Sequence, residues 1–331
     1  MRSSRCESMV TRQARFTYFL LEELENMNTI PISEPSLSSR AMLCSLSIRM
    51  WSARKHDAEA SEEIATRHGA QADAGRYHKI LLPKAALAEI QAIISESRQE
   101  HYFLTLPWDD NGYRVLPAAA YMDHVERMSR LRGRFSVAVE ALGTQFARLV
   151  EEARSRLGSL FRFEDYPSSA QLAEKFAFET KVMPLPEAGD FRVSLGDEEK
   201  ARIQRQIQAS VEASLQIGSR ELWFRLYDAV RHMAERLNAY KVTDTGVEHP
   251  FRDSLVTNLV KLVEVLPKLN LTGDADLERL ASEAKDSLLV DPARLRRSDK
   301  MREETARAAA DIAQRMAGYM AGYSIPESGA A

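Results

Sequence analysis

The chain has 331 residues, of which 44% are hydrophobic and 28% are charged, a composition that indicates a folded protein and excludes an intrinsically disordered one. Its 45 basic and 48 acidic residues give a net charge of −3. This balance excludes both a strongly basic nucleic-acid clamp and an acidic mimic of DNA, but it leaves room for a local basic patch. Glycine and proline are sparse, with 14 and 12 residues, and this scarcity favours long uninterrupted helices.

Residues 1–41 differ in character from the rest of the chain, and we expect them to form a poorly ordered extension and linker. Residues 31–39 are rich in proline and serine, which is typical of a linker. The apolar cluster Phe16–Leu21 is short and is followed at once by acidic residues, which argues against a secretory signal. We therefore expect one mainly helical domain over 42–320, followed by a frayed tail over 321–331.

The first part of this domain mixes short strands and helices. Leu43–Ile48 alternates apolar and small residues with a period of two, which predicts a strand. Helices are expected over about 58–68 and 84–104, and Pro83 is a plausible first-turn residue for the second of them. The stripe predicted to face the core on this second helix contains Leu87, Ile90, Ile94 and either His101 or Tyr102.

Two long stretches with heptad patterns, about 118–157 and 197–239, are the most informative feature of the chain. Apolar residues in the first stretch recur in steps of three and four, a period of 3.5 that is typical of a helix with a supercoiled partner. At about 1.5 Å per residue, a helix of about 40 residues is roughly 60 Å long. Three further helices are expected in the C-terminal part of the chain, at about 251–269, 275–289 and 300–320.

A β element is predicted between the two long helices. Residues 176–183 alternate large and small side chains and are rich in aromatics, which indicates a strand, and residues 191–195 are its expected antiparallel partner. The result is a β-hairpin head at about 176–195. The predicted fold is therefore mainly α: a long antiparallel coiled-coil helical hairpin with a small β-hairpin element and additional packed helices.

The sequence contains no local motif for catalysis, a cofactor or a metal ion. Its seven histidines and two cysteines, Cys6 and Cys44, form neither a His-x3-His pair nor a cluster with metal-ligand spacing. The glycine patterns that bind phosphates or dinucleotides are also missing. Two lone cysteines indicate a reducing compartment, and no apolar run approaches the ~18 residues of a spanning helix. We predict no catalytic, cofactor or metal site, no membrane partner and a cytoplasmic location.

A basic patch with interleaved aromatic residues is the best candidate contact surface. Aromatic rings beside cations suit single-stranded nucleic acid, because bases stack on the rings while the cations bind phosphates. In the alternative interpretation, Trp51 belongs to the core and the cations lie on a solvated face. The candidate residues for contact with nucleic acid or a protein partner are Arg49, Trp51, Arg54, Lys55, Arg76, Tyr77 and Lys79.

Several motifs, taken in order, resemble the family called domain of unknown function 3150. They are Leu46–Asp57, Ala74–Lys79, Thr105–Asp109, Phe176–Glu179 and Phe251–Leu255. The resemblance covers roughly residues 43–320. It implies a protein of bacteriophages, plasmids and mobile elements in the bacterial cytoplasm, often encoded near MoxR-type AAA ATPases and von Willebrand A-domain proteins. It supplies no catalytic residues.

The long helices and this resemblance together predict a non-enzymatic accessory protein. It would bind protein partners, such as an AAA ATPase, or form a homo-oligomer. The alternative is a single-stranded DNA-binding protein of replication or recombination. A third hypothesis, an enzyme whose site is built from distant residues, requires titratable side chains that converge in a pocket.

Overall fold

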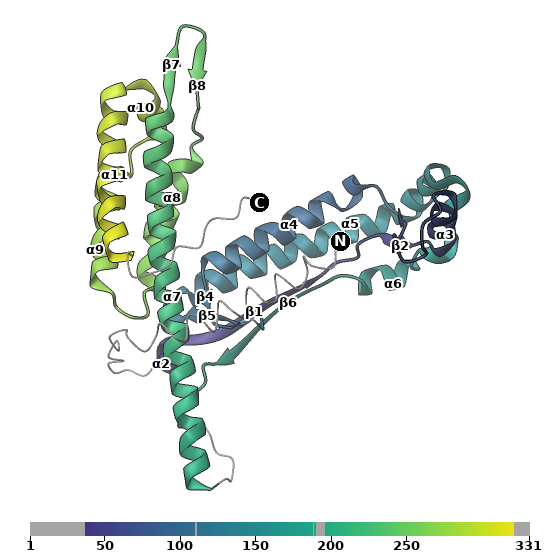
Figure 1. The fold of residues 1–331 in the computed structure, drawn as a ribbon, viewed down its shortest axis with the longest axis horizontal. Helices are drawn as coiled ribbons and strands as arrows, with labels where there is room; N and C mark the ends of the chain where they lie inside the picture. Colours follow the sequence, from purple (N-terminus) through teal and green to yellow (C-terminus); the bar gives the residue numbers. More distant parts are fainter. Residues whose placement is uncertain (1–36, 110, 188, 190–195, 321–331) are drawn as a thin grey trace. The chain divides into compact units, whose positions relative to one another are not determined.

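The computed structural model describes residues 37–109, 111–187, 189 and 196–320, and the chain divides into two compact units (Figure 1). The sheet unit is Met42–Met183, and the helical unit comprises Met1–Ala41 together with Pro184–Ala331. The boundary between the units, at Met183–Pro184, falls inside the range 42–320 that the sequence predicts as one domain. Both contain long helices, and the only sheets among the described residues are small, so the mainly α class is confirmed.

The sheet unit combines a four-stranded sheet, a separate two-stranded sheet and two long helices. The larger sheet has the strand order β4-β5-β1-β6, and β2 pairs with β3 in antiparallel fashion. The strands and helices are β1 Ala41–Arg49, β2 Arg54–His56, α3 Ala58–Arg67, β3 His78–Ile80, α4 Lys84–Phe103, β4 Leu106–Pro107, β5 Arg114–Pro117, α5 Tyr121–Leu157, α6 Ser169–Glu174 and β6 Ala177–Pro184. Short 3-10 turns are η2 Ala118–Ala120, η3 Gly158–Leu160 and η4 Phe163–Asp165.

The core of the sheet unit is built on the buried stripe of α5. From His124 to Leu142 this stripe advances in alternating steps of four and three, as the heptad pattern predicts, and the spacing becomes irregular after Leu142. On α4, Leu87, Ile90 and Ile94 are buried as predicted. The buried residues of α5 are His124, Met128, Leu131, Phe135, Ala138, Leu142, Phe146, Leu149, Val150 and Ala153.

Each long helix packs against an antiparallel partner within its own unit, and these partners differ from the predicted ones. Helix α5 packs on α4, and ion pairs from Arg127 to Glu100 and from Arg134 to Glu96 show that the two run in opposite directions. The other long helix, α7 (Asp197–Ala239), belongs to the helical unit and packs on α11. A heptad stripe indicates that a helix packs against a partner, but not which partner. The short β4–β5 connection between α4 and α5 brings α5 back onto α4.

The helical unit gathers shorter helices around α7. The Trp223 and Tyr319 rings stack with their centroids 5.2 Å apart, and Arg302 lies 4.6 Å from the ring centroid of Tyr240, so α7 and α11 are antiparallel. The remaining elements are α2 Leu37–Arg40, β7 Lys241–Thr243, β8 Gly246–Glu248, α8 Ser254–Leu269, α9 Ala275–Leu288, α10 Pro292–Arg297 and α11 Asp299–Met320.

The predicted β-hairpin head is only partly described. The strand expected at 176–183 is β6, and its neighbour in the sheet is β1, which confirms the strand expected at Leu43–Ile48. The other half of the predicted hairpin, residues 191–195, lies outside the described residues, as do 1–36 and the tail from 321 onward. Among the described helices, none is both long and apolar enough to cross a membrane.

Candidate functional site

The antiparallel pair β2–β3 carries three of the seven predicted contact residues, Arg54, Lys55 and Lys79. Its register places Arg54 opposite Ile80 and Lys55 opposite Lys79. All three residues of β2 are exposed, whereas Lys79 is the buried residue of β3, so the pair of strands divides its cations between the solvent and the interior. Arg54 and Lys55 are exposed, as is Arg76 just before β3, whereas the side chain of Lys79 is buried.

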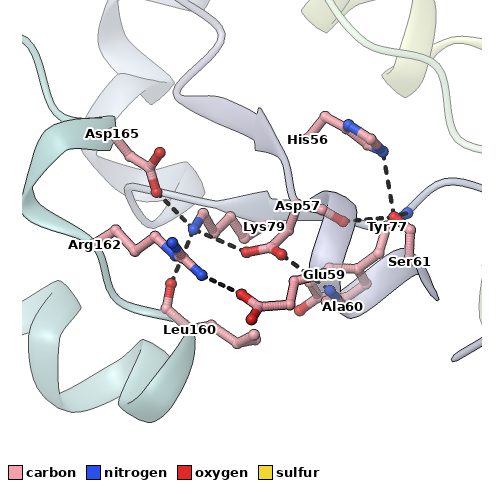
Figure 2. Close-up of polar contacts among 10 residues, drawn as sticks. All are labelled: His56, Asp57, Glu59, Ala60, Ser61, Tyr77, Lys79, Leu160, Arg162 and Asp165. Atoms are coloured by element: carbon pink, nitrogen blue, oxygen red, sulfur yellow. Dashed lines mark hydrogen bonds and ion pairs between the residues drawn. The ribbon is translucent and has the colours of Figure 1, made fainter. Parts of the chain in front are cut away.

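Lys79 binds two buried carboxylates, and we call this group the Lys79 cluster. Its Nζ lies 2.9 Å from Oδ2 of Asp57 and 2.6 Å from Oδ2 of Asp165, and it donates to the carbonyl oxygen of Leu160 at 3.0 Å (Figure 2). The three charged side chains are only 2%, 7% and 8% exposed. The cluster therefore joins β3 and the start of α3 to the turns that follow α5.

The environment of the cluster keeps both Lys79 and Asp57 charged. Burial alone would lower the pKa of Lys79, but hydrogen bonds to Asp165 and Asp57 outweigh it, so the pKa is raised. The pKa of Asp57 is lowered, first because its carboxylate accepts a hydrogen bond from the backbone N–H of Ala60 at 3.0 Å, and second because it binds Lys79. Asp57 thus caps α3 and neutralises Lys79 at the same time.

Backbone hydrogen bonds fix the segment that leads into β3. The N–H of Asp57 donates to the carbonyl oxygen of Tyr77 at 3.0 Å, and the N–H of Tyr77 donates to Oγ of Ser61 at 2.9 Å. The Ser61 hydroxyl donates in turn to the carbonyl oxygen of Asp57 at 2.6 Å and lies 3.3 Å from Nε2 of His56 (Figure 2). The backbone of Tyr77 is held in place, and its neighbour Arg76 stays exposed.

Trp51 and Arg49 have partners within the sheet unit. The Trp51 ring meets the Phe146 ring edge-on, with centroids 6.0 Å apart, and it packs against the core of the sheet unit. The guanidinium of Arg49 donates to the carbonyl oxygen of Glu174 at 3.0 Å. Trp51 is partly buried and packs against the core, which favours its interpretation as a core residue. Lys79 is buried and is therefore unavailable to a phosphate. The predicted contact residues that remain exposed are Arg49, Arg54, Lys55 and Arg76.

Acidic side chains share this end of the sheet unit. Helix α3 presents Glu59, Glu62 and Glu63 to solvent, and Glu59 forms an ion pair with Arg162 (Figure 2). Exposed cations on β2 are thus followed by exposed carboxylates on α3, the next element along the chain. Such a mixed surface suits a protein partner better than an extended polyanion.

A second polar cluster lies in the core of the sheet unit, where the sequence predicted no site. Cys44 of β1, His101 of α4 and His124 of α5 are all buried, and one potential ligand atom of each lies within 4.8 Å of the others. Nδ1 of His101 is 3.0 Å from Nε2 of His124. The prediction that no metal-ligand cluster exists considered only residues close in sequence. His101, rather than Tyr102, occupies the core position of the α4 stripe, which was the one available signal.

Burial determines the protonation of this second cluster. It raises the pKa of the Cys44 thiol to about 12, although the charge of Arg114 acts in the opposite direction. Burial also lowers the pKa of His124 to about 4 and, together with the charges of His124 and Arg114, lowers that of His101 to about 3. At neutral pH the cluster therefore consists of one thiol and two neutral imidazoles.

No family model, no curated protein and no solved structure matches this chain. The resemblance to domain of unknown function 3150 stays a prediction from sequence motifs.

Proposed function

We propose that this chain is a non-enzymatic accessory protein of a phage or mobile element that acts by binding a protein partner. The resemblance to domain of unknown function 3150 supports the context. The observation that supports partner binding is an exposed apolar pair on the β7–β8 hairpin, which projects from the end of α7 (Figure 1). Val242 and Val247 lie directly opposite each other in register and are 63% and 47% exposed.

Two physical arguments connect this pair of valines with a partner. Residues that lie directly opposite in an antiparallel pair share one face, so the two side chains form a single apolar surface. A two-stranded hairpin is also only marginally stable by itself in water, and a partner that covers this face would stabilise it. The family resemblance points to a MoxR-type AAA ATPase as the first partner to test, followed by a von Willebrand A-domain protein.

Replacing both Val242 and Val247 with aspartate is expected to weaken binding to a MoxR-type AAA ATPase on the order of thirtyfold, since two apolar contacts are lost and two charges are introduced. Size-exclusion chromatography with light scattering would detect the complex, and a titration would give the Kd. The matched control is Val137→Asp, because Val137 is an equally exposed valine (67%) on α5 of the sheet unit.

The control variant is expected to bind like the wild-type chain. Two results would overturn the proposal: a double variant that binds as tightly as the wild type, or a wild-type chain that stays monomeric and forms no complex with either partner.

Single-stranded nucleic-acid binding is a second candidate function. It is supported by the exposure of Arg54 and Lys55 on β2 and of Arg76 just before β3. If Arg54 and Lys55 each bind a phosphate, replacing both with alanine should reduce the slope of log K against log salt by about 1.4. Fluorescence anisotropy of labelled single-stranded DNA at several salt concentrations would measure this slope. The matched control replaces Arg130 and Arg132, two exposed cations of α5, with alanine. Wild-type protein that fails to bind at low salt would rule out this function.

A further inference from the structure

The geometry of Cys44, His101 and His124 points to a binding site for a thiophilic metal ion, and we propose Cu(I) in preference to Zn²⁺. The three residues come from three different elements of the sheet unit, namely β1, α4 and α5. Each residue is at least 97% buried, so the three polar side chains face one another in the core and not the solvent. This inference does not depend on the proposed binding of a protein or nucleic-acid partner.

The potential ligand atoms lie close enough together to converge on one metal ion. With metal–nitrogen bonds of about 2.0 Å and metal–sulfur bonds of about 2.3 Å, ligand atoms around one ion lie about 3.3–3.8 Å apart. The nitrogen atoms of His101 and His124 are 3.0 Å apart, and the three atoms together, including Sγ of Cys44, lie within 4.8 Å of one another. Small side-chain movements, of up to about 1 Å, would therefore enclose an ion.

Hydrogen bonds next to the cluster hold one of its ligands in place. The hydroxyl of Thr105 donates to the carbonyl oxygen of His101 at 2.6 Å, and Nε of Arg114 donates to the same hydroxyl at 2.7 Å. These contacts fix the last turn of α4 against β5. They hold the backbone from which the His101 ring extends.

Charge and ligand number favour Cu(I). A thiolate selects soft ions such as Cu(I) and Zn²⁺ over Mg²⁺ or Ca²⁺. A thiolate with Cu(I) is electrically neutral, whereas with Zn²⁺ it leaves a net positive charge in a buried site near Arg114, which is unfavourable. Within the described part of the chain, the cluster has three such ligands, and structural zinc sites need four.

Binding of Cu(I) would exchange one proton for one ion. The Cys44 thiol loses its proton to solvent as the sulfur–copper bond forms. The imidazoles of His101 and His124 are already neutral. Whichever of them donates the hydrogen bond between the two rings moves its proton to its other ring nitrogen, so that both facing nitrogens become ligands. No electron is transferred, because copper is supplied as Cu(I).

Reduced, full-length protein is expected to retain one equivalent of Cu(I) per chain after anaerobic dialysis against a Cu(I) chelator buffer, measured by inductively coupled plasma mass spectrometry. A parallel dialysis against buffered Zn²⁺ distinguishes the two ions, and we expect weaker retention of zinc. Cys44→Ala and His124→Gln should each weaken Cu(I) binding on the order of a hundredfold or more. The matched controls are Cys6→Ala and His232→Gln, which remove the other cysteine and an exposed histidine, and both should bind like the wild type.

X-ray absorption of the wild-type copper complex keeps the proposal testable even if a core variant fails to fold. One sulfur and two nitrogen neighbours around copper are expected. The proposal is overturned if the wild type retains neither ion, if copper has only nitrogen and oxygen neighbours, or if Cys44→Ala binds as tightly as the wild type. Retention of zinc with a sulfur neighbour, and of no copper, would overturn the assignment of Cu(I).

Discussion

Replacing Lys79 with methionine is expected to destabilise the sheet unit by about 3–5 kcal/mol, because it removes one partner of a buried ion-pair network and leaves two buried carboxylates behind. Methionine keeps much of the length of the lysine side chain but has no charge. Asp57 and Asp165 are 7% and 8% exposed, so water cannot replace the lost ammonium group. Urea unfolding of the full chain, followed by hydrogen exchange of the sheet-unit amides, would measure the change.

The register of the antiparallel pair β2–β3 offers a matched control for this prediction. Lys55 lies directly opposite Lys79 but is exposed, so Lys55→Met should change the free energy of unfolding by no more than about 0.5 kcal/mol. A further variant, in which Lys79→Met is combined with Asp57→Asn and Asp165→Asn, should recover part of the loss, since no unpaired charge remains. A Lys79→Met protein as stable as the Lys55→Met protein would contradict the structural role assigned to Lys79.

The sequence identifies the buried faces of helices better than it identifies what covers them. The stripe of α5 could be predicted because burial of one face imposes a 3.5-residue period on nearby residues. The identity of the partner depends on connections and on long-range packing, which the period does not contain. Hence the extents of all four helices were predicted to within about three residues, whereas the pairing of α5 with α4 and of α7 with α11 was not predicted.

Both polar clusters of the sheet unit escaped prediction for the same physical reason. Lysine is almost never fully buried unless it is paired, and the carboxylates that pair with Lys79 lie in other elements of the chain. The aromatic and basic pattern therefore placed Lys79 on the surface. Likewise, His101 could be predicted as a core residue of α4, but its neighbours Cys44 and His124 meet it only through the packing of β1 and α5.

Phe135, a residue of the predicted stripe, packs α5 against β6. Phe135 is 4% exposed, and its ring centroid lies 6.4 Å from that of Phe176 and 5.7 Å from that of Phe178. Phe135→Ala is expected to destabilise the sheet unit by about 3–5 kcal/mol, because it removes a large buried ring and leaves a cavity between the helix and the sheet. The control is Val137→Ala, two residues along the same helix, where the side chain is 67% exposed and the expected change is at most about 0.5 kcal/mol.

Urea unfolding would compare the two variants, and hydrogen exchange of the β6 amides would show whether loss of the ring loosens the strand. Equal stabilities for the two variants would mean that the aromatic contact does not hold β6 against α5, and that the stripe is buried by α4 alone.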